Sequence, residues 1–176
     1  DVSAYIPTNV ISITDGQIFL ETKLFFEGQR PAVNVGLSVS RVGGAAQTKA
    51  MKKASGTIRI DLAQYRELEV FTQFSSDLDE TTKAQLNHGN ALMELLKQPL
   101  NHPLSMADQV ITLILAQEKY FDDVDKSQVK KLQNNVLSAV RDTAADVYNT
   151  LEEKNELNDG IKARIIDAAN KYKASR

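Results

Sequence analysis

The pattern of apolar residues changes near residue 45, and this change constrains the fold more than any other feature of the chain. Before it, glycine is frequent and short β-branched runs alternate with turn signals. After it, glycine is rare and apolar residues recur every three or four positions. The first pattern is typical of strands and the second of amphipathic helices. We therefore predict an α+β chain, with a β-rich piece over residues 1–47 and an all-α helical bundle over residues 48–176.

The β-rich piece contains runs that favour strands. Residues 10–14 and 17–20 flank a turn signal at Asp15 and Gly16, and residues 33–39 follow a second turn. Their lack of clean polar alternation is typical of a sheet buried on both faces. The piece has too few strands to complete an α/β domain. Because the chain also starts with Asp rather than Met, we expect it to be part of a longer polypeptide; trimming of a few residues is the alternative.

The second piece shows apolar faces for a series of helices. The first residue of each face is Ile58, Leu86, Val110, Val129 or Ile161. Asp79 is a candidate N-cap, and the run from Ser105 to Asp108 fits the start of a helix. The breaks between helices are predicted at the prolines 99 and 103 and at residues 158–160.

Arg41 lies within an apolar, glycine-flanked run over residues 34–44. Val35, Leu37 and Val39 alternate with small residues, so we expect a buried strand that ends at the arginine. A guanidinium held there would be a fixed and permanently charged fork, which suits a phosphate. A structural arginine paired with an acid at the end of a strand is the alternative.

Composition excludes several kinds of site. The chain has 176 residues, a net charge of -2 and no cysteine, so it has no disulfides and no Cys-based metal site. No apolar run approaches the ~18 residues of a membrane span. The histidines at 88 and 102 lack ligand partners at metal spacing, so we expect no metal site and assign both to surface or capping roles. Residues 28–60 carry six bases and no acid, but they lack clustered aromatics and a nucleic-acid reader motif, so we expect no nucleic acid partner.

Several segments resemble one family, the alpha subunit of the catalytic head of the rotary (F-type) ATP synthase. Residues 1–17 (DVSAYIPTNVISITDGQ) and 30–43 (RPAVNVGLSVSRVG) carry the resemblance. The runs LAQYREL at 62–68, FSSDLD at 74–79 and LLKQP at 95–99 follow in the order of the family. The resemblance covers residues 1 to about 99 and fades after that. The chain would be roughly the C-terminal third of such a subunit.

The resemblance implies a fold and a setting. Residues 1–47 would be the last strands of a RecA-like α/β nucleotide-binding domain, and residues 48–176 the C-terminal helical bundle. The full-length, non-catalytic and regulatory alpha subunit would hold ATP or ADP with Mg²⁺. This part would bind no nucleotide tightly and hydrolyse none, because G-x-x-x-x-G-K-[ST] is absent from it. The implied partners are the beta subunit, the gamma rotor and the delta and other stator components. They would form a proton-translocating complex, peripheral to the cytoplasmic side of a bacterial plasma membrane or to the equivalent organelle face.

The resemblance also implies roles for single residues. Arg41 matches the arginine finger, which reaches in trans into the catalytic site of the beta subunit. Ser12 matches a serine near the phosphate bound at that catalytic site. Near the nucleotide of alpha's own non-catalytic site, the matching residues are Phe25, Arg30, Pro31 and Gln98, with Gln98 at the adenine. The family's second glutamine is Leu100 here, which leaves either a lost adenine contact or apolar packing against the base. A residue matched only by family has simpler alternatives: a backbone-bonded serine at 12 and a core aromatic at 25.

Two further interpretations stay open. The family's rotor-facing loop corresponds to residues 75–79, although an acidic loop between helices is also the usual form of a solvated connection. The whole chain could instead be a stand-alone helical interaction module derived from this family, with Arg41 kept for packing and with no catalytic role.

Overall fold

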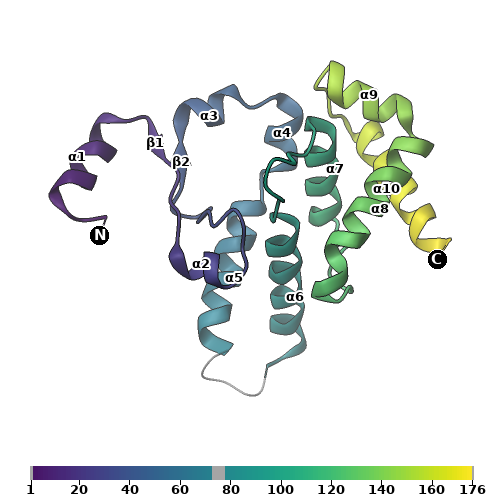
Figure 1. Ribbon diagram of the computed structural model, residues 1–176. Helices are drawn as coiled ribbons and strands as arrows, with labels where there is room; N and C mark the ends of the chain where they lie inside the picture. Colours follow the sequence, from purple (N-terminus) through teal and green to yellow (C-terminus); the bar gives the residue numbers. More distant parts are fainter. Residues whose placement is uncertain (1, 73–77, 176) are drawn as a thin grey trace. The chain divides into compact units, whose positions relative to one another are not determined.

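The computed structural model describes residues 2–72 and 78–175, and it is mostly helical with one small sheet (Figure 1). The chain divides into two compact units, Asp1–Gln47 and Thr48–Arg176. Among the described residues, none of the helices combines the length and the apolar character needed to cross a bilayer.

The first unit contains three short helices and a minimal sheet. Its elements are α1 (Tyr5–Ile13), β1 (Gly16–Gln17), α2 (Thr22–Phe26), β2 (Val39–Ser40) and α3 (Arg41–Ala46). The strands β1 and β2 are antiparallel, with Gly16 opposite Ser40 and Gln17 opposite Val39. An isolated antiparallel bridge joins Leu20 to Val33.

The strand predicted at residues 10–14 is wrong, because α1 runs through it as far as Ile13. A strand needs a neighbour for its backbone groups, whereas a helix satisfies them within the segment. Hydroxyl groups support the helix from within: the Thr8 hydroxyl donates to the Ala4 carbonyl at 2.8 Å, and the Thr14 hydroxyl to the Val10 carbonyl at 3.0 Å. The strands predicted at 17–20 and 33–39 are reduced to the short pairing of β1 with β2 and to the bridge.

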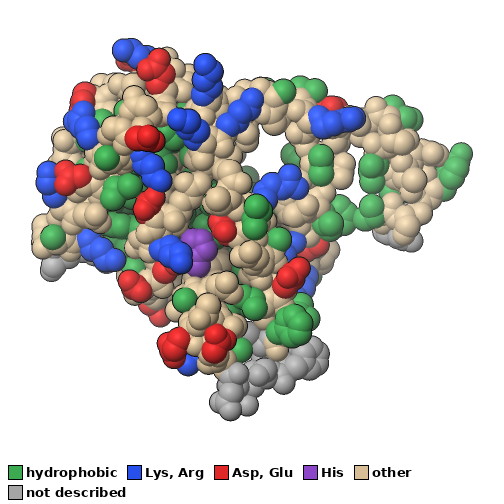
Figure 2. Space-filling view, turned by 180° about the vertical axis from the view of Figure 1, so that it is seen from behind, with side chains coloured by type: hydrophobic (Ala, Val, Ile, Leu, Met, Phe, Trp, Pro, Cys, Tyr) green, Lys and Arg blue, Asp and Glu red, His purple; other side chains and the backbone are tan. Residues whose placement is uncertain are grey.

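Apolar side chains lie on the surface of this unit rather than in a sheet interior. Tyr5 and Ile13 are both 83% exposed and Phe26 is 81% exposed. Figure 2 shows such side chains, in green, over the part of the chain at the right of the view. The prediction of strands buried on both faces is therefore wrong for the described residues.

The second unit is a bundle of helices. Its elements are α4 (Lys49–Ala54), α5 (Ile58–Thr72), α6 (Glu80–Leu95), α7 (Met106–Gln117), the 3₁₀ turn η1 (Lys126–Gln128), α8 (Val129–Thr143), α9 (Ala145–Glu153) and α10 (Asp159–Ala174). The helices predicted from apolar faces are confirmed as α5, α6, α7, α8 and α10. The short helices α4 and α9 were not predicted.

The core of the bundle is built around α7. Along this helix Ala107, Val110, Ile111 and Leu115 are fully buried. It packs against α4, α6, α8, α9 and α10. A helix that is apolar on most sides is the expected centre of such an arrangement.

Capping residues fix where the bundle helices begin. The Ser105 hydroxyl accepts a hydrogen bond from the Asp108 backbone N–H at 3.1 Å, which confirms the predicted start of α7. Asn158 caps α10 in the same way, through the Ile161 N–H at 2.9 Å. Asp79 precedes α6, but its carboxylate accepts from the Thr82 hydroxyl and makes no side-chain hydrogen bond to the backbone of the helix.

A glycine sets the close approach of α5 and α6. A Cβ atom on Gly89 would lie 2.1 Å from Cδ2 of Tyr65 and 2.4 Å from its Cβ. The Tyr65 ring is buried, and its hydroxyl donates to Asn90 Oδ1 at 3.0 Å. The Cβ atom of Tyr65 is bonded directly to the backbone, so rotation of the tyrosine side chain cannot relieve this overlap.

We expect Gly89→Ala to lower the free energy of unfolding of the bundle by about 1–3 kcal/mol, because the added methyl forces α5 and α6 apart. This loss should outweigh the ~1 kcal/mol that alanine gains over glycine in a helix. Urea unfolding followed by circular dichroism measures the change. Gly56→Ala is the matched control, since its Cβ would meet its nearest neighbours at 3.7 Å, an ordinary contact. Equal stability of the two variants would contradict the packing described.

Candidate functional site

Arg41 is the first residue of α3 and directly follows β2. Its side chain is 81% exposed, and its Nε lies 3.6 Å from Asp15 Oδ1. The preceding Val39 is 41% exposed, so the prediction of an arginine at the end of a buried strand is wrong. The reason is that β2 pairs only with β1 over two residues, which covers neither of its faces.

Asp15 holds both the start of α3 and the arginine. This residue lies between α1 and β1, and its Oδ2 accepts a hydrogen bond from the Val42 N–H at 2.8 Å. Its other oxygen faces Arg41. The Ser40 hydroxyl accepts from the Gly43 N–H at 2.9 Å and caps the same helix. The guanidinium is therefore oriented by one carboxylate on an otherwise open surface.

Ser12 lies on α1 and is exposed. Its hydroxyl donates to the Asn9 carbonyl at 2.7 Å, within its own helix. This is the backbone-bonded arrangement that the sequence left as an alternative to a phosphate contact. The hydroxyl oxygen is still an acceptor, whereas its proton is committed to Asn9 in this structure.

Phe25 of α2 and Arg30 come together, and Pro31, the next residue, is exposed. The Arg30 guanidinium carbon lies 4.5 Å from the centroid of the Phe25 ring, in a cation–π arrangement. Phe25 is 47% exposed, so it is not a core aromatic. The turn that returns the chain to the ring uses Gly28 at a φ of 84°, a conformation that favours glycine. An exposed ring with a cation above it offers a flat surface and a positive charge in one place.

Gln98 belongs to the other unit and follows the end of α6. It is exposed, and Leu100 is 86% exposed. The position that we matched to a second glutamine therefore presents an apolar side chain to the surface. The predicted rotor-facing loop, residues 75–79, lies outside the described residues over 75–77.

Sequence reasoning missed Asn34, which organises the segment that leads to Arg41. This side chain is 3% exposed. Its Nδ2 donates to Glu21 Oε1 at 2.6 Å, and its Oδ1 accepts from the Leu37 N–H at 3.0 Å. Its carbonyl accepts from the Ser38 hydroxyl at 2.6 Å. An asparagine two residues before a glycine is a turn signal that could have identified it.

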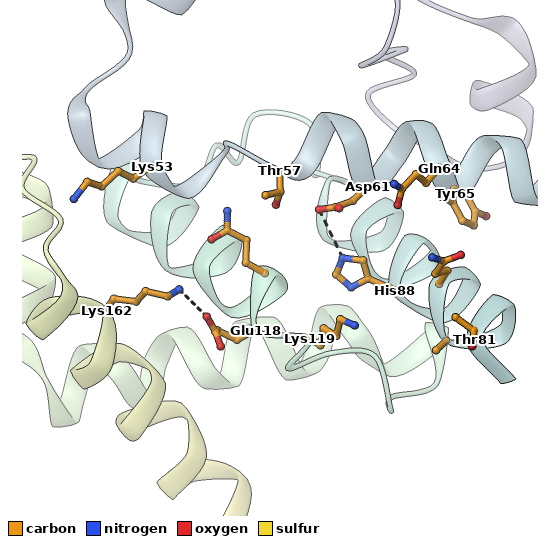
Figure 3. Close-up of a pocket in the computed structure, with 13 residues that line it drawn as sticks. Lys53, Thr57, Asp61, Gln64, Tyr65, Thr81, His88, Glu118, Lys119 and Lys162 are labelled. Carbon is orange, nitrogen blue, oxygen red and sulfur yellow. Dashed lines mark ion pairs between the residues drawn. The ribbon is translucent and has the colours of Figure 1, made fainter.

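His88 was also missed, because we assigned it to a surface or capping role. It lies on α6 beside a cavity of about 710 Å³ in the bundle, and its side chain is 15% exposed (Figure 3). Its Nδ1 is 2.9 Å from Asp122 Oδ1, and its Nε2 is 3.9 Å from Asp61 Oδ2. The hydrogen bond to Asp122 raises the pKa of His88, and the charges of both aspartates add to this effect against the opposing effect of burial. No group of three or more His, Asp or Glu side chains suited to a metal ion occurs among residues 2–72 and 78–175.

Comparisons with known proteins show which family the chain belongs to. The nucleotide-binding domain of the ATP synthase alpha/beta family matches residues 1–40, and the C-terminal domain of the ATP synthase alpha/beta chain matches residues 47–172. The second match continues well past residue 99, where we expected the resemblance to fade.

Curated proteins named ATP synthase subunit alpha match nearly the whole chain. The protein from Mycobacterium sp. (strain KMS) is 51% identical over 173 residues, which are 98% of this chain and 32% of that protein. The one from Petrotoga mobilis is 52% identical over 172 residues, 98% of this chain and 34% of that protein. The one from Rhodococcus erythropolis is 54% identical over 173 residues, with shares of 98% and 32%. The chain thus spans about a third of the length of these relatives. It belongs to the ATP synthase alpha/beta family, and the relatives described above are named as alpha subunits.

Proposed function

We propose that this chain is part of the alpha subunit of a proton-translocating ATP synthase, and that Arg41 supplies an arginine finger in trans to the catalytic site of a neighbouring beta subunit. Two observations support the proposal. The relatives named above are alpha subunits at 51–54% identity. The observation that carries the finger role is the 81% exposure of the Arg41 side chain, which leaves the guanidinium accessible to another chain.

The chemistry of phosphoryl transfer explains why an arginine suits this role. Negative charge spreads over the oxygens of the transferred group and over the attacking and leaving groups in the transition state. A planar guanidinium is always charged and donates along two parallel directions, which a lysine ammonium does not. An arginine finger is worth about 10³–10⁵ in rate where it has been measured in GTPases.

The structure adds a condition to this role. Arg41 is held by one carboxylate contact on an open surface rather than by a buried strand. An exposed ion pair stabilises a geometry by only about 0–1 kcal/mol, and a misplacement of about 1 Å degrades catalysis. We therefore propose that packing against beta supplies the remaining rigidity, which would make turnover sensitive to how the two subunits meet.

The amino-acid residues matched to a nucleotide-binding site form a second part of the proposal. Arg30 stacked on the exposed Phe25 ring offers a charge for phosphate and a face for a base, and Gln98 offers amide donors and acceptors. We propose that Phe25, Arg30, Pro31 and Gln98 belong to alpha's own non-catalytic site, which would hold ATP or ADP with Mg²⁺ in the full-length subunit. Ser12 is proposed to contact the catalytic phosphate by rotating its hydroxyl away from Asn9.

The domain and partner assignments are proposed in the same way. Residues 1–47 would belong to the RecA-like domain and residues 48–176 to the C-terminal bundle. The partners would be the beta subunit, the gamma rotor and the delta and other stator components of a peripheral membrane complex, facing the cytoplasm or the equivalent organelle compartment. The 176 residues contain no G-x-x-x-x-G-K-[ST] run, so we propose that they do not hydrolyse ATP by themselves.

One observation favours the second candidate, a helical interaction module without a catalytic role. The pairing of Arg41 with Asp15 is what a purely structural arginine would make. The two functions differ in whether turnover of an assembled enzyme depends on the guanidinium.

We expect Arg41→Lys, made in the full-length alpha subunit and assembled with its partners, to lower steady-state ATP turnover by about 10³-fold or more, because lysine lacks the planar fork. Assembly and nucleotide binding should change little. Turnover by the purified complex and the amount of intact complex measure the two effects. Arg59→Lys is the matched control, because Arg59 is an exposed arginine of α5 in the other unit. Near-normal turnover of the Arg41 variant would reject the finger and favour the structural role.

Asp15→Asn should loosen Arg41 and leave α3 in place, because the amide oxygen still accepts from the Val42 N–H while the charge is lost. The expected change in stability is below about 1 kcal/mol. Relaxation of the Arg41 Nε signal in NMR measures the mobility of the guanidinium. Asp15→Ala removes both contacts and should also raise the mobility of the Val42 amide. An unchanged Arg41 signal in both variants would show that Asp15 does not orient it.

Gln98→Ala in the assembled enzyme should weaken nucleotide binding at the non-catalytic site by about tenfold, which is the loss of one hydrogen bond near 1.4 kcal/mol. Leu100→Ala tests whether apolar packing on the base has replaced the family's second glutamine. Equilibrium binding to complexes with blocked catalytic sites gives both values. If neither variant changes binding, the adenine contact is absent from this segment.

A further inference from the structure

We propose that His88 is a proton-dependent clamp of the helical bundle: its imidazolium joins α6 both to α5 and to the turn after α7, and loss of one proton releases α5 alone. The clamp lies within the unit Thr48–Arg176 and does not depend on the proposed function. It rests on the positions of three side chains, His88, Asp61 and Asp122.

Carboxylates face both nitrogens of the ring. Nδ1 lies 2.9 Å and 3.1 Å from the two oxygens of Asp122, and Nε2 lies 3.9 Å from Oδ2 of Asp61. All three side chains are mostly buried, with exposures of 15% for His88, 25% for Asp61 and 16% for Asp122. Figure 3 shows the ring on α6 pointing toward Asp61 on α5. The histidine therefore lies between two elements that are far apart in the sequence.

The two contacts respond differently to the loss of a proton. A neutral imidazole carries one N–H, and the short contact to Asp122 favours keeping that proton on Nδ1. Nε2 then presents a lone pair to the carboxylate of Asp61, and the attraction between them ends. Deprotonation thus removes the tie from α6 to α5 and preserves the tie from α6 to Asp122. A neutral ring cannot serve both carboxylates, and an imidazolium can.

The other charges near the ring modify this behaviour without replacing it. Lys119, in the turn after α7, opposes the positive charge on His88. The remaining charges around the cavity are engaged with other groups. Lys162 of α10 pairs with Glu118 at 2.7 Å, and Lys53 of α4 donates to the Leu157 carbonyl at 3.1 Å. Asp61 and Asp122 are therefore the acids that determine the charge state of the ring.

The cavity gives the clamp its access to solvent. The space of about 710 Å³ is lined by His88, Asp61 and Lys119, together with residues from α4, α6, α7 and α10. Water in such a polar cavity can carry a proton to and from the ring. It can also solvate the Asp61 carboxylate once the imidazolium is gone. A sealed core would instead leave that carboxylate buried and unpaired, at a large cost.

The sign of the pH dependence follows from the raised pKa of His88 in the folded chain. The imidazolium stabilises the fold fully below the ordinary histidine value near 6.5, and this contribution is lost as the pH rises through the higher folded value. Each unit of separation between the two values corresponds to about a tenfold change in the folding equilibrium constant. Stability should therefore fall between about pH 6.5 and the folded value, and α5 should be the element that loosens.

The first experiment compares two histidine variants of the 176-residue chain. His88→Asn keeps a donor near the position of Nδ1 and removes the charge, and His102→Asn alters the other, exposed histidine. Urea unfolding at a series of pH values from 5.5 to 8.5 gives the folding equilibrium constant of each form. As the pH rises, we expect the folding equilibrium constants of the unmodified chain and of the His102 variant to fall by the same factor. The fall for the His88 variant should be smaller by a factor of about ten. Parallel curves for all three forms would overturn the clamp.

A second measurement separates the two ties and remains valid if one variant folds poorly. NMR titration of the ring signals should show His88 titrating above His102 in the unmodified chain. Asp122→Asn should bring the His88 midpoint down strongly, whereas Asp61→Asn should lower it less. Hydrogen exchange, corrected for intrinsic rates, should show protection of α5 amides around Asp61 falling between pH 6 and pH 8, with amides near Asp122 unchanged. A His88 midpoint at or below that of His102, or equal loss of protection at both places, contradicts the proposal.

Discussion

Burial of α7 is the constraint on which the bundle depends. This helix carries fully buried apolar side chains along most of its length and packs against α4, α6, α8, α9 and α10. Each surrounding helix therefore needs only one apolar face, and its other face is free to carry charge. That division explains how a bundle can place His88 at the edge of a polar cavity, between Asp61 and Asp122, without weakening its core. Gly89 lets α5 approach α6 closely enough for the histidine of one helix to face the aspartate of the other.

The bundle could be predicted from the sequence because its signals are local. The apolar faces of α5, α7, α8 and α10 repeat within each helix, and Ser105 and Asn158 mark where two of the helices begin. The face of α6 was placed less well: Leu92 and Leu95 are its buried leucines, whereas Leu86 is only half-buried. The short helix α4 was hidden because its lysines suggested only a basic stretch. Those lysines lie on its exposed side, and Ala50, Met51 and Ala54 lie buried on the other.

The first unit shows why strand signals are weaker evidence. A β-branched run indicates a strand only if another segment supplies the ladder, and that partner is not encoded in the run. In the described residues the ladder amounts to β1, β2 and one bridge, and the run that ends at Ile13 is helical. The surroundings of Arg41 were likewise not encoded in the residues next to it. The sequence identified Arg41 and its chemistry, but its surroundings depend on a contact from Asp15, which is distant in the chain, and on the loop held by Asn34. The contact of Arg30 with Phe25 spans a single turn, and it depends on the backbone conformation of that turn at Gly28.

The exposed apolar side chains of the first unit have a consequence for how the protein behaves in solution. Tyr5, Ile13 and Phe26 each present more than four fifths of their surface to water. The net charge of only -2 supplies little repulsion between molecules. Salts that strengthen the hydrophobic effect, such as sulfate, should therefore promote self-association of the chain at lower concentrations than is usual for a helical bundle.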